Sequence, residues 1–172
     1  SSATWGRVGT TPGSATPTVG APGLEVLAPG PLSVVADLGR PGRAAQGVAR
    51  SGAVDRGALR RANRLVGNPA AAATLEVAGG GLRVRALGDL VVAVTGAPAP
   101  LVLVVDGTET DVGTGRAFAV DRGGELCLGV PDRGMLASRA VAGGVAGEPV
   151  LGSLATDLLS GVGPGRLQAG DV

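Results

Sequence analysis

The sequence contains no histidine, lysine, tyrosine or isoleucine, and all 15 of its basic residues are arginines. Without lysine there is no Schiff-base lysine, no residue to carry biotin, and no Walker-type phosphate loop, whose pattern requires one. Without histidine there is no Ser-His-Asp or Cys-His pair and no histidine metal site. We therefore do not expect a self-contained hydrolase of a familiar kind.

Cysteine is nearly absent as well. Cys127 is the single one, so the chain has no internal disulfide, and we expect no metal site. Its place in a leucine-rich run predicts a small buried residue rather than a nucleophile. One Phe, one Trp and a net charge of +1 offer neither a stacking platform nor an overall positive charge for nucleic acid. No apolar run reaches the ~18 residues that span a bilayer, and no signal peptide is recognisable, so we expect a soluble cytoplasmic protein.

What is present suffices for one ordinary domain. The chain has 172 residues, of which 44% are hydrophobic, 32 are glycine and 12 are proline. Residues 13–23 combine Gly, Pro, Ser and Thr with scarcely any core-forming side chain, which is typical of a linker. We expect residues 1–23 not to fold and a packed core to begin near residue 24.

Short Val/Leu-rich runs separated by Gly, Pro or Asp follow from residue 24 onward. They predict strands at 24–27, 32–36, 74–78, 82–86, 90–95, 102–106, 116–120, 125–129 and 139–142. Apolar and polar residues alternate at 82–86, which predicts a strand with one solvent-exposed face. Residues 91–94 do not alternate and should form a central strand covered on both sides. Asp106-Gly107 predicts a tight hairpin turn. Many short strands with one helix indicate a mainly β domain, either a barrel or a sandwich.

The one helix is predicted at about residues 55–66. Its apolar residues fall on one face: Ala58, Leu59, Ala62, Leu65 and Val66. Asp55 can cap it, with Ser51 as an alternative start, and Gly67-Asn68-Pro69 is a strong stop signal. Asn63, a poor helix former in mid-helix, predicts a hydrogen bond either to a neighbouring buried loop or to a ligand.

The segment before this helix is a candidate binding site. Arg50, Ser51 and Asp55 bring a guanidinium, a hydroxyl and a carboxylate to the start of a helix. This set suits a ligand with a carboxylate or an amide, because Arg binds carboxylates bidentately and a helix N-terminus favours negative charge. The alternative is that Ser51 and Asp55 only cap the helix.

A second hydroxyl and carboxylate set occurs at Ser153–Asp157. Because the chain lacks His and Lys, a general base has to be Asp or Glu, and the catalytic candidates are Asp55 and Asp157, with Thr156 beside the latter. The alternative is a cap on a short C-terminal helix. Glycine pairs predict turns at 79–81 and 123–124, whereas Gly143 and Gly144 could also let the backbone approach a ligand.

Several ordered blocks carry a family resemblance. They are Asp37–Gly42 (DLGRPG), Gly47–Asp55 (GVARSGAVD), Ala62–Asn68 (ANRLVGN), Ala140–Gly144 (AVAGG) and Val150–Ser153 (VLGS). In these blocks residues 24–172 resemble the first half of the third, C-type subunit of bacterial ATP-dependent 5-oxoprolinase. The same family is known as biotin-dependent carboxyltransferase or allophanate hydrolase subunit 2. Leu154 stands where the family usually has arginine, and Ser138 where it usually has an aromatic residue. The sequence stops at Gly170-Asp171-Val172, where family members are about half complete, so we expect the domain at 24–172 to be incomplete.

The N-terminus carries a second, shorter resemblance. Residues Trp5–Pro12 (WGRVGTTP) are similar to the end of the B-type partner subunit of the same enzyme. Residues 1–23 are therefore expected to be the tail of a fused B-type subunit followed by the linker.

The resemblance implies a cyclophilin-like β-barrel and work in a complex that opens 5-oxo-L-proline to L-glutamate at the expense of ATP. Arg50, Ser51 and Asp55 would orient the substrate, supported by Asn63, Thr156 and Asp157. ATP would be handled mainly across the subunit interface or by partners of the A and B types, and the isolated chain would be inactive.

Two alternatives remain open at this stage. One is a biotin-dependent carboxyltransferase of the urea carboxylase or allophanate hydrolase type, with biotin on a partner. The other is a non-catalytic regulator of a histidine-kinase inhibitor.

Overall fold

The structure is a computed structural model that describes residues 18–19 and 23–172. Its strands form two five-stranded antiparallel sheets and one short two-stranded ribbon. The first sheet has the order β2-β5-β10-β7-β8, with β2 (Leu24–Pro29), β5 (Leu82–Ala86), β10 (Glu125–Leu128), β7 (Leu101–Val105) and β8 (Thr108–Asp111). The second has the order β3-β4-β11-β6-β9, with β3 (Leu32–Ala36), β4 (Thr74–Ala78), β11 (Leu136–Val141), β6 (Leu90–Gly96) and β9 (Ala117–Val120). The ribbon pairs β1 (Thr18–Val19) with β12 (Val145–Ala146).

The predicted mainly β class is confirmed, with a difference in closure. The strands pair as two separate sheets rather than as one closed barrel. The corner at Gly30-Pro31 sends β2 and β3 into different sheets, where β2 pairs with β5 and β3 with β4. The predicted linker falls mostly on residues 1–17 and 20–22, which lie outside the described residues together with the Trp5–Pro12 motif.

The larger of two apolar clusters lies between the two sheets. Alternate residues of the strands supply it, because successive side chains of a strand point to opposite faces. Its fully buried members include Leu75, Val77, Val84, Val92, Val94 and Leu126. In β5 the outward residues Arg83 and Arg85 remain accessible to solvent, as the alternation predicted.

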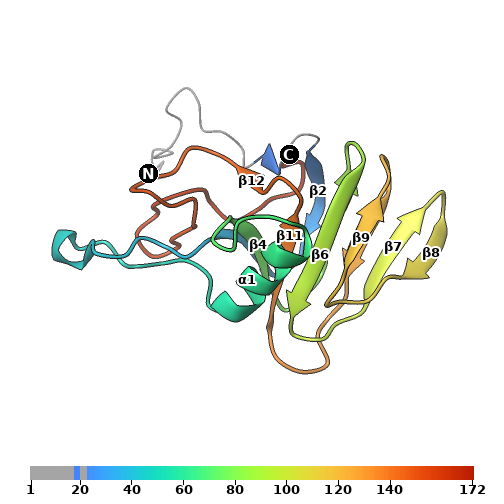
Figure 1. Ribbon diagram of the computed structural model, residues 1–172, viewed down its shortest axis with the longest axis horizontal. Coiled ribbons are helices and arrows are strands. Elements are labelled where there is room, and N and C mark those ends of the chain that lie inside the picture. Colours follow the sequence, from blue (N-terminus) through green and yellow to red (C-terminus); the bar gives the residue numbers. More distant parts are fainter. Residues whose placement is uncertain (1–17, 20–22) are drawn as a thin grey trace, which may run out of the picture.

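One α-helix and one 3₁₀ turn occur in the described part of the chain. α1 (Arg56–Leu65) lies across the outer face of the second sheet, against β6 and β11, and η1 (Ala44–Gln46) lies in the loop before it (Figure 1). The Thr95 hydroxyl of β6 donates to the Ala58 carbonyl of the helix at 2.7 Å. β6 is therefore covered on both faces along most of its length, as predicted, and only Val91 is exposed within the expected apolar run.

Residues with positive φ form the tight turns between neighbouring strands. Asp106 and Gly107 both have positive φ, 49° and 77°, which makes the two-residue turn of the β7–β8 hairpin. At Gly80 a Cβ would lie 2.1 Å from the Gly129 carbonyl oxygen, so the turn between β4 and β5 has no room for a side chain. No helix in the described ranges is long and apolar enough to cross a membrane.

Several elements differ from expectation. The short helix considered for Ser153–Asp157 is wrong, because these residues make isolated bridges, Val150 with Ser153 and Asp157 with Val162. The strand expected at 139–142 instead runs over β11, and β8 and β12 were not predicted. β1 was not predicted either, since it falls within the residues 1–23 that were expected not to fold. β8 reads Thr-Glu-Thr-Asp and is exposed throughout, so no apolar side chain marks it.

Arg139 on β11 is an unusual member of the core. It alternates with Ala137 and Val141, which belong to the core between the sheets, and its side chain is completely buried. None of its three guanidinium nitrogens has a hydrogen-bond partner among the described residues. Burial lowers the pKa of Arg139 to about 10, so the group still carries its charge at neutral pH. A buried charge without a partner opposes folding.

We predict that Arg139→Leu stabilises the chain by at least about 2 kcal/mol, because it replaces an unpaired buried cation with apolar volume. Urea unfolding of both proteins measures the difference. Arg122→Leu, at an exposed position, is the control and should change stability by less than about 0.5 kcal/mol. A loss of stability in Arg139→Leu would show that the guanidinium is partnered in solution.

Candidate functional site

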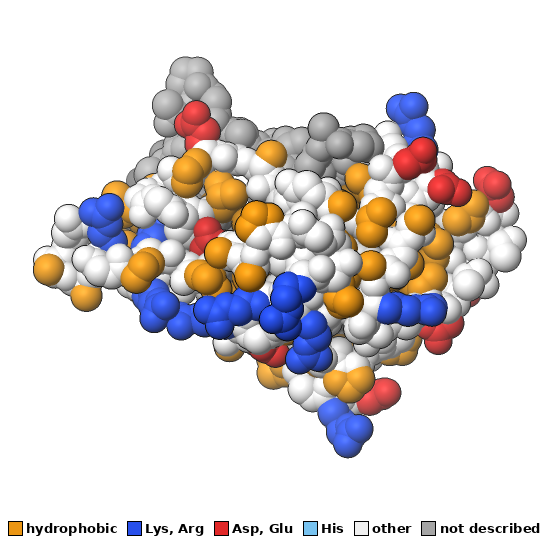
Figure 2. Space-filling model, in the orientation of Figure 1, with side chains coloured by type: hydrophobic (Ala, Val, Ile, Leu, Met, Phe, Trp, Pro, Cys, Tyr) orange, Lys and Arg blue, Asp and Glu red, His pale blue; other side chains and the backbone are white. Residues whose placement is uncertain are grey.

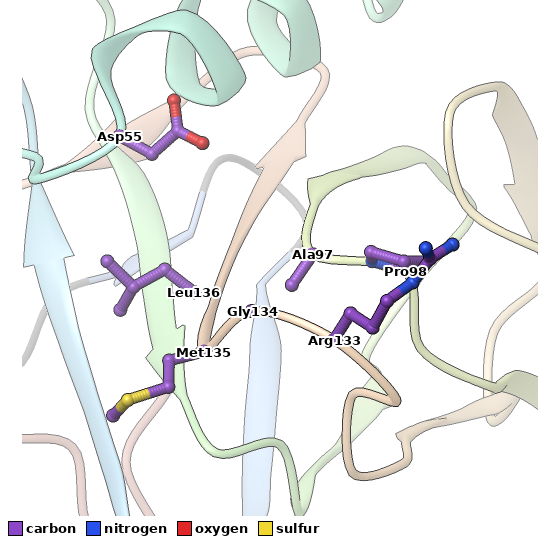
Figure 3. A pocket seen from close by; sticks show the side chains of 7 residues that line it. All are labelled: Asp55, Ala97, Pro98, Arg133, Gly134, Met135 and Leu136. Atoms are coloured by element: carbon purple, nitrogen blue, oxygen red, sulfur yellow. The ribbon is translucent and has the colours of Figure 1, made fainter.

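Asp55 stands at the N-terminus of α1, where its side chain caps the helix. Its Oδ1 accepts a hydrogen bond from the Ala58 amide at 2.8 Å. The same carboxylate lies on a pocket of about 550 Å³, whose size falls within the range of small-molecule sites. Figure 3 shows the residues that line it, which are Asp55, Ala97, Pro98, Arg133, Gly134, Met135 and Leu136. Asp55 therefore both caps the helix and lines the pocket. Its Oδ1 makes the cap, whereas its Oδ2 has no partner among the described residues.

Glu76 of β4 binds the backbone at Asp55 through hydrogen bonds. Its Oε2 accepts the amide of Val54 at 3.0 Å and that of Asp55 at 3.4 Å, and the residue is only 6% exposed. Burial raises the pKa of Glu76 and the charge of Asp55 adds to this, while the two amide hydrogen bonds work in the opposite direction. Two carboxylates thus meet at the start of α1, one buried and one exposed.

Analysis of the sequence missed Glu76 as a site residue. It was given no site role there, although a single carboxylate within Thr-Leu-Glu-Val-Ala is itself a signal. A carboxylate inside a buried strand needs hydrogen-bond donors, and a helix N-terminus offers free N–H groups.

We predict that the wild-type chain loses stability relative to Glu76→Gln as the pH rises from the ordinary pKa of 4.5 through the higher pKa of Glu76 in the folded chain. The folded chain keeps the Glu76 proton to a higher pH than the unfolded chain, whose pKa is near the ordinary 4.5. Between those two values the folded state binds more protons, so the free energy of unfolding falls with rising pH. Urea unfolding at several pH values measures this. Glu148→Gln, at an exposed position, is the control, and a difference that stays constant with pH would contradict the account.

The two segments chosen from the sequence meet in the structure. The Ser51 hydroxyl donates to Asp157 Oδ2 at 3.0 Å, although 106 residues separate them. Asp157 also accepts the amides of Leu159 and Ser160, at 3.0 and 3.2 Å. The Ser160 hydroxyl is the largest cause that lowers the pKa of Asp157, helped by that residue's amide and by Ser51. With its oxygens engaged in this way, Asp157 is a weaker proton acceptor than a free carboxylate, and its catalytic role stays a prediction.

Asp37 and Arg40, from the DLGRPG block, hold the C-terminal segment in place. Asp37 accepts the Ser153 hydroxyl at 2.6 Å and the Leu154 amide at 2.7 Å. Arg40, 1% exposed, donates to the carbonyls of Val150 at 2.9 Å and Ala155 at 2.7 Å. These bonds fix the turn at Leu151-Gly152 and the residues that follow it, which explains why no helix forms there. Figure 1 shows this segment beside the loop that precedes α1.

Asn63 faces a neighbouring loop rather than the pocket. Its Nδ2 donates to the Ala72 carbonyl at 2.7 Å, and its Oδ1 accepts from Asn68 at 3.2 Å. Asn68 Oδ1 in turn accepts the Gly143 amide at 2.9 Å. Of the two roles open for Asn63, the structure therefore shows the bond to a loop.

The other predicted site residues lie away from the pocket. Gly143 and Gly144 form the turn between β11 and β12, and the Gly144 amide donates to Val141. Arg50 is exposed, while the Thr156 hydroxyl is buried without a partner among the described residues. Asp55 alone, among all predicted site residues, lines the pocket. The structure adds Arg133, which lies in the β10–β11 loop.

Positive charge is concentrated around α1. Residues 40–64 contain seven arginines and one carboxylate, and α1 itself has no acidic residue in its first turn. Four of these arginines belong to the helix: Arg56, Arg60, Arg61 and Arg64. Figure 2 shows basic side chains as a band over this part of the surface, with few acidic ones among them. The band favours the approach of anionic reactants to the pocket at the helix N-terminus.

This chain is similar to known proteins of one family. The family model described as carboxyltransferase domain, subdomain A and B, matches residues 46–172. The 5-oxoprolinase C subunit of Escherichia coli (strain K12) is 40% identical over 146 residues, which are 84% of this chain and 46% of that protein. Urea amidolyase of Lachancea kluyveri is 33% identical over 153 residues, 87% of this chain and 8% of that enzyme. The chain thus spans about half the length of the 5-oxoprolinase relative.

Solved structures agree with these sequence matches. The crystal structure of TTHA0988 is 40% identical with a TM-score of 0.76, over 87% of this chain and 54% of that one. The crystal structure of the K. lactis urea amidolyase is 33% identical with a TM-score of 0.72, over 77% of this chain and 8% of that one.

Proposed function

The chain belongs to the carboxyltransferase domain family, subdomains A and B, and from this premise we propose that it is part of an ATP-dependent 5-oxoprolinase. In this role it works with partner subunits to hydrolyse 5-oxo-L-proline to L-glutamate. The relatives named as the C subunit of 5-oxoprolinase support the proposal, one at 40% identity and one, from Haemophilus influenzae, at 32%. The observation that carries the site is the Asp55 carboxylate on the pocket at the start of α1.

The chemistry of the reaction explains why partners are needed. Opening a resonance-stabilised amide in a five-membered ring is unfavourable, so it has to be coupled to phosphoryl transfer from ATP. This chain carries no phosphate-binding motif, and we propose that partners of the A and B types bind the nucleotide. The isolated chain would then be inactive. That its relatives are named as one subunit of an enzyme or lie within a larger amidolyase is consistent with such a division of labour.

Asp55 is proposed to act on the ring amide. Its free Oδ2 can accept the lactam N–H or take a proton during ring opening, a role for which the chain offers no histidine or lysine. Glu76 keeps Asp55 in place through the two amide bonds described above. The arginine band on α1 would raise the local concentration of the anionic substrate.

We predict that Asp55→Asn lowers turnover of the assembled enzyme by at least about 100-fold while leaving the fold nearly unchanged. Asparagine caps a helix about as well as aspartate, so α1 should keep its start. Turnover is measured as ATP-dependent glutamate formation, and stability by urea unfolding. Asp121→Asn, at an exposed turn, is the control. Retained turnover in Asp55→Asn would remove Asp55 from the chemistry.

Biotin-dependent carboxyl transfer is a second candidate, favoured by the family description and by the urea amidolyase relatives. It requires a biotinylated partner, because this chain has no lysine to carry biotin. Carboxylation of urea that is abolished by avidin would support it, whereas 5-oxoproline turnover insensitive to avidin would support the first proposal.

A further inference from the structure

We propose that the outer face of α1 docks an acidic surface of a partner protein. The arginines of the helix, Arg56, Arg60, Arg61 and Arg64, would bind carboxylates of that partner. That the partner is a subunit of the same enzyme complex rests on the function proposed above. Such a contact would place the pocket at Asp55 beside an interface between subunits.

The four arginines lie on the side of α1 that faces away from the second sheet. The buried residues of the helix fall on one side of the helical period, and the arginines fall on the opposite side (Figure 2). Arg60, Arg61 and Arg64 are exposed, and Arg56 is partly exposed. None of the four makes an ion pair within the described residues, where the salt bridges all join strands of the first sheet. Their guanidinium groups are therefore free to bind carboxylates, each through two parallel hydrogen bonds.

This arrangement of charge disfavours the helix itself. Arg56, Arg60 and Arg64 follow one another at intervals of four residues, where like charges on neighbouring turns repel. Arg56 also lies in the first turn, where the helix dipole disfavours a cation, and that turn contains no acidic residue. Only Arg64, in the last turn, is favoured by the dipole. A role in binding therefore accounts for these charges better than a role in folding.

The composition of this face favours a protein over a nucleic acid as the partner. It carries no lysine and no aromatic side chain on which a base could stack. Leu65, 36% exposed, adds apolar surface beside the arginines. Arginine is enriched and lysine depleted in protein interfaces. A long nucleic acid would also be repelled by the rest of the chain, where acidic residues outnumber basic ones.

The second half of the helix is separate from the pocket. Asp55 precedes the first turn, whereas Arg61 and Arg64 lie toward the C-terminal end. The ten residues of α1 rise about 15 Å along its axis. A partner seated over the C-terminal half would therefore lie beyond Asp55 along the helix, with its own groups close to the pocket. This agrees with a reaction that is shared between subunits.

The test measures, by calorimetry, how the whole protein that contains this chain binds its purified A-type and B-type partner subunits. The dissociation constant of the wild type should rise at least about tenfold between about 0.05 and about 0.5 M salt, because salt screens the charges. Arg60→Gln combined with Arg64→Gln should weaken binding at low salt at least about tenfold and remove most of the salt dependence. Arg122→Gln combined with Arg166→Gln removes the same charge from exposed positions elsewhere, and this control should bind like the wild type.

Two further measurements separate binding from folding. Arg60→Lys combined with Arg64→Lys keeps the charge and should restore most of the binding. Urea unfolding of the double Gln variant should show a stability equal to or greater than that of the wild type, because the repulsion within the helix is reduced. A less stable double Gln variant would assign the arginines to the fold and overturn the inference.

The remaining outcomes also decide. Equal affinity of the wild type and the double Gln variant for the partner subunits overturns the inference and leaves the proposed function standing. Tighter binding of duplex DNA than of the subunits, lost in the double Gln variant, overturns it in favour of a nucleic acid. Arginine-dependent binding in a complex that forms no glutamate upholds the docking face and contradicts the proposed function. No binding of the subunits by the wild type overturns both.

Discussion

The position of α1 depends on one buried carboxylate. The Glu76 carboxylate is buried in the middle of β4. It accepts hydrogen bonds from the amides of Val54 and Asp55, which would otherwise have no partner at the helix start. The raised pKa of Glu76 shows that its burial disfavours the charged form of the carboxyl group. The helix can then lie across β6 and β11, and Asp55 is turned to the pocket edge. The same contact that secures the helix therefore sets the geometry of the candidate site.

A large part of the fold could be predicted from local sequence. Residues 74–78 and 82–86 are strands with the predicted bounds, and the helix begins and ends within one residue of the expected 55–66. These elements have strong periodicity and clear turn or cap residues at their ends. β8 could not be found in this way, because its four residues are polar and its pairing with β7 is set by the Asp106-Gly107 turn.

The candidate site was harder to predict, since its parts come together only in the folded chain. Asp55 was identified because a helix start is a local feature. Glu76 and Arg133 lie 21 and 78 residues further along, and no local pattern joins them to Asp55. The net charge of +1 was equally uninformative about the surface: residues 40–64 carry seven arginines and one carboxylate, so the rest of the chain is acidic. Net charge bears on overall behaviour and not on where charge is placed.

The most direct test of the central claim is ATP-dependent conversion of 5-oxoproline to glutamate by the partner subunits, with and without this protein. The chain should be supplied as the whole protein that contains it, because it spans only 46% of the E. coli relative. The account predicts glutamate formation that requires both ATP and this protein. A stable, fully assembled complex that forms no glutamate would contradict it.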